Sequence, residues 1–344
     1  MSKLLELLES DAKLVLEKID FSELNNKKIL LTGASGLLGT HLLVALFLLN
    51  KSNNLNIEVS AVIRSKPLSI HEELFGEKNI TMLSGDLTSS DFLKEIPISD
   101  YIIHSAGYAQ PSIFMSNPIK TIQLNTSTTI ELLNRLNKNG KFVFMSSSEV
   151  YSGLEKVPFS ENDIGTTNTN HPRSCYIEGK RCGEAIVNAY RENGVNAKSI
   201  RLSLAYGPGT RTDDSRVMSN FIQKAIKNKK IEMLDNGAAK RTYSYISDVV
   251  EYVFHILLKG SQNVYNVGGY SGVTISELAK KIGSIYNIPV IYPTLNNEVK
   301  GSPKEVKIDI SRAEAEFGKK AYINFDCGLI NTIKWYDELF KHNE

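Results

Sequence analysis

The sequence predicts an α/β protein built on a doubly wound parallel sheet, with a smaller α/β lobe at the C-terminal end. Two features lead to this expectation. From residue 27 onward, short apolar runs typical of buried strands alternate with longer stretches of helical periodicity, as in a parallel sheet with helical crossovers. After Gly209 the alternation becomes irregular, and short strands mix with helices, which indicates a second lobe interleaved with the end of the sheet.

The composition is that of an ordinary globular protein and excludes several functional classes. The chain has 344 residues, and its net charge of +2 provides no basic field for nucleic acid. The longest apolar run, 42–49, is too short to cross a membrane, and charged residues interrupt the leucines of 1–21, unlike in a signal peptide. The three cysteines form neither a metal-spaced set nor a disulfide framework. We therefore expect a cytoplasmic enzyme with no metal site and no nucleic-acid or membrane partner.

The elements of the main sheet follow one another in a regular order. Strands are predicted at 28–32, 57–63, 80–83, 101–104, 142–145 and 197–204. Helices are predicted between several of them, at 37–49, 119–138 and 176–193. Leucines and a valine at helical spacing in 3–19 predict one or two short amphipathic helices that pack on the body.

The smaller lobe is expected from the irregular part of the chain. Helices are predicted at 215–228, 249–258 and 275–286, with a last helix that ends near Lys341. Short strands are predicted at 231–234, 243–246 and 264–267. The expected organisation is an N-terminal extension at 1–26, a dinucleotide-binding domain at 27–208 that includes interleaved later segments, and a substrate-binding lobe that makes up most of 209–344.

A glycine-rich loop follows the first predicted strand and opens the first crossover helix. Glycines 33, 36 and 39 have the spacing G-x-x-G-x-x-G, which allows a tight turn and lets a pyrophosphate approach the backbone and the helix N-terminus. The position of the loop makes it a Rossmann-like dinucleotide site rather than a chance glycine triplet. The residues expected to bind the dinucleotide here are Gly33, Ser35, Gly36, Leu37, Leu38 and Gly39.

The end of the second strand indicates which dinucleotide is bound. An acidic residue there would accept a hydrogen bond from the ribose 2′-hydroxyl of NAD, but the segment 61–66 has none. Arg64 could instead pair with the 2′-phosphate of NADP. The cofactor is therefore NADP or NAD, with Arg64 favouring NADP. Asp86, after the third strand, is placed to accept a hydrogen bond from the adenine amino group.

A tyrosine and a lysine four residues apart provide acid–base chemistry. Tyr176 and Lys180 lie on one face of the predicted helix 176–193, where an ammonium and a cationic nicotinamide would lower the pKa of the phenol. Such a tyrosine can take a proton from a sugar hydroxyl while hydride leaves for the cofactor. Ser147 and Glu149, at the end of the fifth strand, belong to the same cleft of an open sheet. Ser147 could bind the same hydroxyl, and Glu149 could move a second proton.

Together these motifs, in this order, resemble the extended short-chain dehydrogenase/reductase family that modifies nucleotide sugars. The resemblance runs from about Lys27 to the C-terminal helix and leaves 1–26 outside. The matching segments are the glycine loop, 85–87, 104–106, 147–149, Tyr176 with Lys180, 206–209 and 241–248.

The family resemblance implies a role for each matching residue. Tyr176 and Ser147 would oxidise carbon 4 of a hexose, and Lys180 would hold the cofactor ribose. Leu87 and Ala106 would join Asp86 in the cofactor site. Ser148, Arg216 and Arg241 would contact a nucleoside diphosphate sugar. The resemblance also implies a homodimer, in which the helices at 119–138 and 176–193 form a four-helix bundle.

The resemblance leaves the second chemical step open. The triplet 147–149 is similar to that of GDP-mannose 4,6-dehydratases, which favours a 4,6-dehydratase with Glu149 as base. The segments 175–181 and 213–222 are close to those of UDP-glucuronate decarboxylases, but Lys307 is the only basic residue where those enzymes have an Arg-Lys-Pro segment.

Simpler functions also remain open. A 4-epimerase or a 4-ketosugar reductase needs only the tyrosine, serine and lysine. Leu204 replaces the asparagine that family members use to contact the diphosphate, so the substrate contacts differ here. A dinucleotide-binding sensor or a scaffold is the alternative outside enzymes, although either would be expected to have lost Tyr176 or Lys180.

Overall fold

The protein is described by a computed structural model that covers residues 2–294 and 305–341. Its centre is a seven-stranded parallel sheet in the order β10-β6-β5-β4-β1-β2-β3. The strands are β1 (Lys28–Thr32), β2 (Glu58–Ile63), β3 (Ile80–Ser84), β4 (Ser99–His104), β5 (Leu136–Ser147), β6 (Asn196–Leu202) and β10 (Val264–Val267). This topology confirms the predicted Rossmann-like α/β fold.

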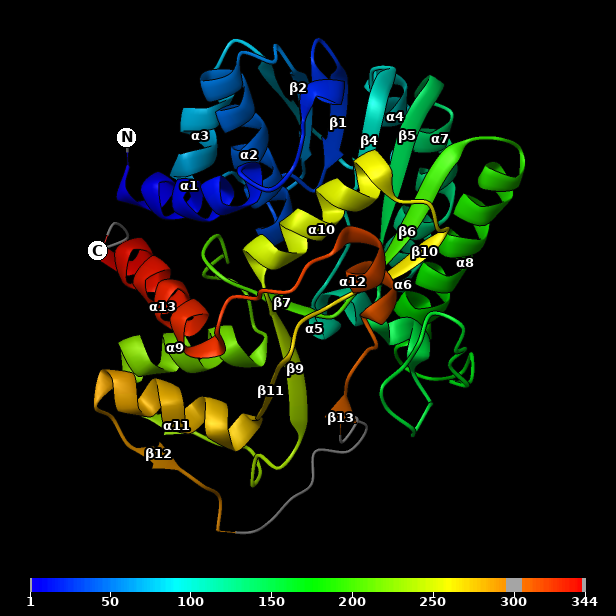
Figure 1. Cartoon of the computed structure of the whole chain (residues 1–344). Coiled ribbons are helices and arrows are strands. Elements are labelled where there is room, and N and C mark those ends of the chain that lie inside the picture. Colours follow the sequence, from blue (N-terminus) through cyan, green and yellow to red (C-terminus); the bar gives the residue numbers. More distant parts are fainter. Residues whose placement is uncertain (1, 295–304, 342–344) are drawn as a thin grey trace.

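Helices cover both faces of the sheet because alternate strand residues point to opposite sides (Figure 1). Ile29 and Leu31 of β1 belong to a core shared with α2 (Leu37–Asn53) and α10 (Ile246–Lys259). Leu30 points the other way, into a second core with α6, α7 and α8. The helices on this second face are α6 (Pro118–Asn125), α7 (Ser127–Leu133) and α8 (Ser174–Glu192). The shorter elements on the way are η1 (Ser22–Leu24), α3 (Ser69–Phe75), α4 (Ser90–Glu95), α5 (Pro111–Ser116) and η2 (Ser148–Tyr151).

The smaller lobe lies below the sheet in Figure 1 and is built around a second sheet. Its strand β9 (Lys240–Tyr245) pairs with β7 (Leu204–Tyr206), β11 (Ser271–Thr274) and β13 (Glu305–Val306). A two-stranded sheet joins β8 (Ile231–Glu232) to β12 (Val290–Ile291). The lobe's helices are α9 (Val217–Asn228), α11 (Ile275–Tyr286) and α13 (Phe325–Lys341), whereas α12 (Ser311–Phe317) packs on β10 of the main sheet. Because β10 returns to the main sheet beside β6, the two parts of the chain are interleaved.

The predicted helix at 119–138 is wrong as a single element. Helix α6 ends at Asn125, α7 ends at Leu133, and β5 begins at Leu136. The break falls in a run of hydroxyl residues whose side chains bond back to the preceding turn: Thr126 donates to Ile122 O and Thr129 to Asn125 O. Such bonds compete with the backbone ladder and bend helices.

The predicted strand at 197–204 is also divided. It leaves the main sheet after Leu202 and continues as β7 in the second sheet. Ser203 is held at the change of sheet, where its hydroxyl donates to Thr242 O. This change carries Leu204 out of the main sheet and toward the smaller lobe.

The N-terminal extension forms one helix, α1 (Lys3–Leu16), which packs against α2, α10 and α13 (Figure 1). Its apolar face is buried, and its buried Asp11 accepts hydrogen bonds from the Tyr245 hydroxyl at 2.8 and 3.0 Å. The expected amphipathic packing helix is therefore present.

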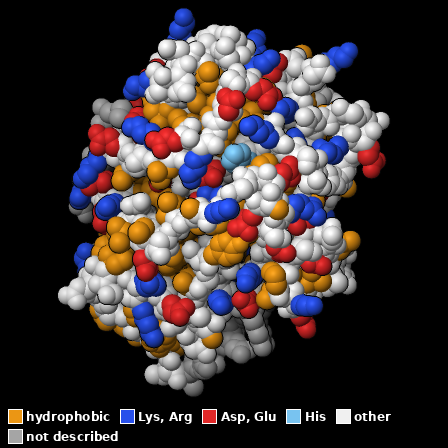
Figure 2. All heavy atoms as spheres, viewed as in Figure 1, with side chains coloured by type: hydrophobic (Ala, Val, Ile, Leu, Met, Phe, Trp, Pro, Cys, Tyr) orange, Lys and Arg blue, Asp and Glu red, His pale blue; other side chains and the backbone are white. Residues whose placement is uncertain are grey.

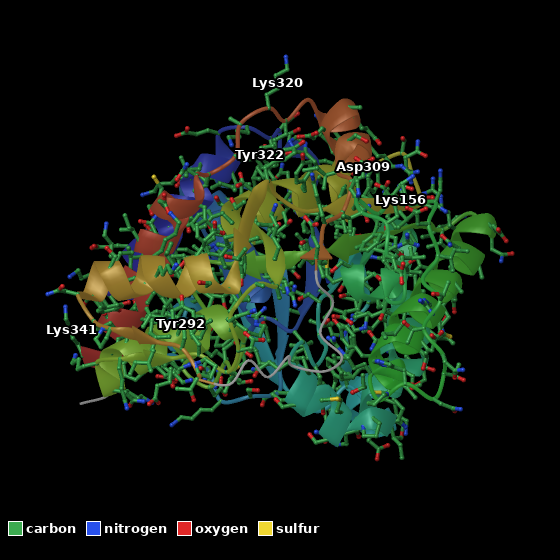
Figure 3. All side chains as sticks on the ribbon, turned by 90° about the horizontal axis from the view of Figure 1, so that it is seen from below. Lys156, Tyr292, Asp309, Lys320, Tyr322 and Lys341 are labelled. Carbon is green, nitrogen blue, oxygen red and sulfur yellow. The ribbon has the colours of Figure 1, made fainter. Side chains whose placement is uncertain are left out.

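The two lobes face each other across the carboxyl ends of the main strands. In the view from below, Tyr292 and Lys341 lie on the side of the smaller lobe, and Lys156 lies on the other side, in the loop between η2 and α8 (Figure 3). Figure 2 shows charges of both signs mixed over the visible face, in keeping with the small net charge.

Candidate functional site

The loop after β1 forms a glycine cradle. Gly33 has φ of +70°, and a Cβ there would lie 2.8 Å from the backbone nitrogen of Ala106. A Cβ on Gly39, in the first turn of α2, would overlap the carbonyl oxygen of Gly33. Gly36 is the N-cap of α2, so the backbone N–H groups of the first turn point toward the loop with no side chain over them. The cradle therefore needs glycine at 33 and 39, and such a loop allows a pyrophosphate to approach the backbone.

A cavity of about 240 Å³ extends from this cradle and is a suitable groove for a dinucleotide. It is lined by Gly33, Ser35, Gly36, Leu37, Arg64, Asp86, Leu87 and Ala106 among the predicted cofactor residues. Leu38 and Gly39 lie in the first turn of α2, where Gly39 packs on the loop. The residues present thus fit the cofactor that the sequence predicts.

The adenosine end of the groove contains groups that sequence reasoning missed. The Arg64 guanidinium lies 4.4 Å from the centroid of the Tyr108 ring. Asp86 forms an ion pair of 2.6 Å with Lys120 of α6. Burial raises the pKa of Asp86, but Lys120 and the hydrogen bonds from Thr88 outweigh it and bring the pKa to about 2. Nothing in the local sequence links Lys120 to Asp86, since only the fold brings them together.

Tyr176 and Ser147 meet at the wall of a second, larger cavity. Tyr176 lies in the first turn of α8, and its hydroxyl is hydrogen-bonded to Ser147 at the end of β5. Its ring stacks on Phe114 of α5 at a centroid distance of 4.6 Å. Burial raises the pKa of Tyr176, and the Ser147 hydrogen bond opposes that rise. The lowering expected from the sequence is therefore not a property of the protein alone, because desolvation of the phenolate is the largest effect.

Lys180 lies one turn further along α8, on the same face. Its Nζ is 5.7 Å from the centroid of the Tyr176 ring and donates to Met145 O at 2.6 Å. Burial lowers the pKa of Lys180 to about 7, and the charge of Glu184 opposes that fall. Gly107 lines the groove, and a Cβ on this residue would lie 3.7 Å from Lys180 Nζ. The amine of Lys180 therefore lies directly behind the groove wall at Gly107.

Glu149 lies in η2 beside the same cluster. Its backbone nitrogen donates to Ser147 Oγ at 3.2 Å, and its Oε1 accepts from Arg173 Nη2 at 2.6 Å. Sequence reasoning missed Arg173, which lies at the N-terminus of α8 and also lines the larger cavity. Arg173 is 24 residues from Glu149 along the chain, so no local sequence pattern indicates that the two side chains pair.

The larger cavity, of about 760 Å³, lies between the Tyr176–Ser147 pair and the smaller lobe. All of the predicted catalytic and substrate residues except Lys180 line it: Ser147, Ser148, Glu149, Tyr176, Arg216 and Arg241. It shares Ala109, Thr210 and Arg216 with the cofactor groove, so the two cavities adjoin. Arg216 is fixed by an ion pair of 2.6 Å with Asp214.

Two apolar residues line this cavity where the family resemblance leads one to expect polar groups. Leu204 lies on the wall in place of an asparagine. Val306 of β13 lies on the cavity wall and is paired with Arg241 on the neighbouring strand β9. Lys307, the next residue, is exposed. The single basic residue of this segment therefore points away from the cavity.

A loop at 207–216 lies at the junction of the two cavities. Arg211 donates to Lys66 O at 2.9 Å, beyond the end of β2. The hydroxyl of Ser215 donates to Gln110 Oε1 at 2.7 Å, on the other wall. The loop thus connects the smaller lobe to both sides of the groove.

The described residues, 2–294 and 305–341, contain neither a metal-ligand cluster nor a membrane-spanning helix. No cluster of three or more histidine, cysteine or acidic side chains suited to a metal ion occurs among these residues. Nor is any helix in this part of the chain both long and apolar enough to cross a membrane.

Comparison with known proteins gives consistent matches. A sequence profile of the NAD-dependent epimerase/dehydratase family matches residues 29–268. UDP-glucuronic acid decarboxylase 6 of Arabidopsis thaliana is 30% identical over 89% of this chain and 87% of its own length. UDP-glucuronic acid decarboxylase 1 of Xenopus tropicalis is 29% identical over 93% of this chain and 75% of its own.

Solved structures match over most of the chain as well. An epimerase from Methanothermobacter thermautotrophicus has a TM-score of 0.78 at 21% identity and covers 96% of this chain and 97% of its own. The dTDP-glucose 4,6-dehydratase of Bacillus anthracis, in complex with NAD, has a TM-score of 0.73 at 20% identity over 90% and 96% of the two chains. At these identities the likeness establishes the shared fold.

Proposed function

The chain belongs to the NAD-dependent epimerase/dehydratase family, and we propose that it oxidises carbon 4 of a sugar carried on a nucleoside diphosphate. The observation that carries this proposal is the cluster of Tyr176, Ser147 and Lys180. Tyr176 and Ser147 line the larger cavity, and Lys180 Nζ lies 5.7 Å from the centroid of the Tyr176 ring. The groove would hold the cofactor, and the larger cavity would hold the sugar and its diphosphate.

Each residue of the cluster has a distinct task in the oxidation. The bound nicotinamide supplies the acceptor for the hydrogen that leaves carbon 4. Tyr176 takes the proton of the 4-hydroxyl, and Ser147 donates a hydrogen bond that orients the same oxygen. Lys180 binds the cofactor ribose and, when protonated, places a positive charge 5.7 Å from the centroid of the Tyr176 ring. Arg216 and Arg241 bind the diphosphate from the wall of the smaller lobe.

NAD is the cofactor that the family description supports. The adenosine end of the groove nevertheless carries two cations, Arg64 and Lys120. The segment 61–66 at the end of β2 has no acidic residue that could accept a hydrogen bond from the ribose 2′-hydroxyl of NAD. We therefore keep the prediction that the cofactor is NADP or NAD, with Arg64 favouring NADP.

Glu149 gives the second step, for which elimination of water between carbons 5 and 6 is the reaction we favour. The 4-ketone acidifies carbon 5, and Glu149 lines the cavity beside Ser147 as the base that can take the proton. The same carboxylic acid can then protonate the departing 6-hydroxyl. The hydride taken from carbon 4 returns to carbon 6 and a proton is added at carbon 5, so the net change is the loss of one water. Val306 on the cavity wall fits a neutral hydroxymethyl group better than a carboxylate.

Decarboxylation of a hexuronate is the second candidate, favoured by a specific observation. The curated relatives include UDP-glucuronic acid decarboxylases, one of which is 30% identical to this chain. Lys307 points away from the cavity, so a hexuronate carboxylate would have to be bound by Arg173 or Arg241, which line it. A 4-epimerase or 4-ketosugar reductase would use the same oxidation and would leave Glu149 without a proton to move.

Mass spectrometry of a substrate panel tests these reactions directly. The protein is incubated with NAD or NADP and, in turn, with UDP-glucose, dTDP-glucose, GDP-mannose and UDP-glucuronate. We expect loss of one water from a hexose. Loss of carbon dioxide from UDP-glucuronate would establish the decarboxylase instead. A product of unchanged mass but new retention time would indicate epimerisation. A reductase would leave all four sugars unchanged and would add two hydrogens to a nucleoside-diphosphate 4-ketosugar supplied with reduced cofactor. No reaction with any of them would contradict the proposed function.

We also propose that two copies associate through the face formed by α5, α6 and α8. Apolar side chains are unusually exposed there, with Ile119 at 72% and Ile122 at 44% of their full accessible area. Helices α6 and α8 pack together in one protomer and would form the four-helix bundle with their copies. Light scattering on Ile119→Glu, with wild type as reference, should show a monomer in place of a dimer.

The unpaired cysteines 175, 182 and 327 suit the reducing cytoplasm that the sequence predicts.

A further inference from the structure

We propose that Arg173 is a positioning residue for this reaction, because it fixes the carboxylate of Glu149 and balances its charge beside Tyr176. The inference rests on the proposed function, since it assigns Glu149 and Tyr176 their tasks. It adds a residue whose pairing no sequence motif indicates. The Arg173 guanidinium contacts the Glu149 carboxylate directly and lies against Phe114, the ring on which Tyr176 stacks.

Arg173 is attached rigidly to the turn that carries Tyr176. It is the N-cap residue of α8, and its carbonyl oxygen accepts the backbone N–H groups of Tyr176 and Ile177, each at 3.1 Å. Its guanidinium lies 5.6 Å from the centroid of Phe114, the ring on which Tyr176 stacks. A shift of Arg173 would therefore disturb the helix turn and the aromatic stack that hold the phenol.

The ion pair is the main polar contact that the guanidinium makes. Arg173 Nη2 donates to Glu149 Oε1 at 2.6 Å, and both side chains are about three-quarters buried. Arg173 Nε is fully buried and has no hydrogen-bond partner within the described part of the chain. Because a buried guanidinium is costly without its carboxylate, the pair holds Glu149 in one orientation at the cavity wall.

The charges of the pair act on Tyr176 in opposite directions. Four charged groups face the phenol: Glu149 of η2, Arg173 and Lys180 of α8, and Arg216 at the start of α9. The negative charge of Glu149 raises the pKa of Tyr176, whereas Arg173 and Arg216 lower it. The carboxylate needed for the second step would by itself hinder the first, and Arg173 removes that conflict.

A fluorinated tyrosine placed at position 176 reports this charge balance without any sugar substrate. Fluorine makes the phenol more acidic, which moves its titration to lower pH values, at which the protein stays folded. The titration is followed by fluorine NMR. Arg173→Met should raise the midpoint by about one pH unit, and Glu149→Gln should lower it by a similar amount. The double variant should return close to wild type. Arg191→Met, at the far end of α8, is the matched control and should leave the midpoint unchanged.

Opposite shifts that cancel in the double variant are the signature of a charge pair. Shifts in the same direction, or none for Arg173→Met, would overturn the proposal, because a merely structural arginine would not give a compensating pair. The titration still reads out if no sugar in the panel reacts, so failure of the proposed function and failure of this inference are distinguishable.

Kinetics with the sugar that reacts in the panel provide the second test. Arg173→Met should lower kcat on the order of tenfold at neutral pH, with KM little changed, and Arg173→Lys should restore part of the loss because it keeps the charge. A rise confined to KM for UDP-glucuronate would overturn the proposal in favour of an arginine that binds the substrate carboxylate.

Discussion

Replacement of Lys180 by methionine should make the cofactor-free protein more stable while it removes activity. Lys180 is buried, and its amine has one hydrogen bond of 2.6 Å to Met145 O. Burial lowers its pKa from 10.5 to about 7, with Glu184 opposing the fall. Protonated Lys180 is thus held in the fold at a cost in free energy. Methionine has a similar length and no charge, so it avoids that cost.

The size and sign of the effect follow from proton linkage. Between pH 7 and 10.5 the unfolded chain holds a proton on Lys180 that the folded chain has lost, so wild-type stability rises with pH in this window. The full cost is present below about pH 7 and shrinks by about 1.4 kcal/mol per pH unit above it. The advantage of Lys180→Met should therefore be about 3 kcal/mol larger at pH 6 than at pH 9. Loss of the bond to Met145 reduces the advantage at both pH values without changing this difference.

Urea denaturation at the two pH values measures the difference. The single tryptophan, Trp335, is buried and reports unfolding by fluorescence. Lys94→Met is the matched control, because the Lys94 side chain is 73% exposed and should show no such pH dependence. An advantage of Lys180→Met that is equal at pH 6 and pH 9 would refute the reasoning.

Three further predictions concern the cofactor and the oxidation. Tyr176→Phe should abolish turnover and leave the dissociation constant of the dinucleotide unchanged in calorimetry, since the phenol acts on the sugar; turnover within a few fold of wild type would be inconsistent with its role. Gly39→Ala should lower cofactor affinity by at least tenfold and lower the melting temperature, because the added methyl would overlap the Gly33 carbonyl; unchanged binding would argue against the cradle. Arg64→Ala should weaken NADP more than NAD, by roughly tenfold in the ratio of their dissociation constants, and an unchanged ratio would refute the phosphate assignment.

The sequence predicts the main sheet well because its strands are short, apolar and bounded by turns. The glycine loop could be recognised because its chemistry is local: the turn, the close approach and the helix N-terminus are all encoded within eight residues. Tyr176 and Lys180 were found for the same reason, since four residues on a helix place two side chains on one face.

Features that depend on the fold could not be predicted. The helix expected at 119–138 is broken by hydroxyl side chains that bond to their own backbone, and apolar periodicity does not record this. The pairs Glu149–Arg173 and Asp86–Lys120 join different elements, so no spacing reveals them. The pKa of Tyr176 was expected to fall beside Lys180 and a cationic nicotinamide. In the protein alone, burial, to which the stacked Phe114 ring contributes, raises this pKa.

The position of Leu204 shows how a substitution that is visible in the sequence gains meaning from the fold. The sequence places leucine where an asparagine is expected, and β7 carries that leucine to the wall of the larger cavity. Under the proposed function, the diphosphate would then be bound by the arginines of the same wall, Arg216 and Arg241. This is a physical reason to expect a substrate pose that differs from that of the relatives.

Oxidation at carbon 4 by Tyr176 is the central claim, and isotope transfer tests it most directly. The protein with bound oxidised cofactor is mixed with the reactive nucleotide sugar, which carries deuterium at carbon 4. The reaction is quenched rapidly, and the deuterium content of the nicotinamide cofactor is measured by mass spectrometry. We predict that deuterium passes to the nicotinamide of the wild-type protein and not to that of Tyr176→Phe. Product formation with no deuterium on the nicotinamide at any quench time would contradict oxidation at this carbon.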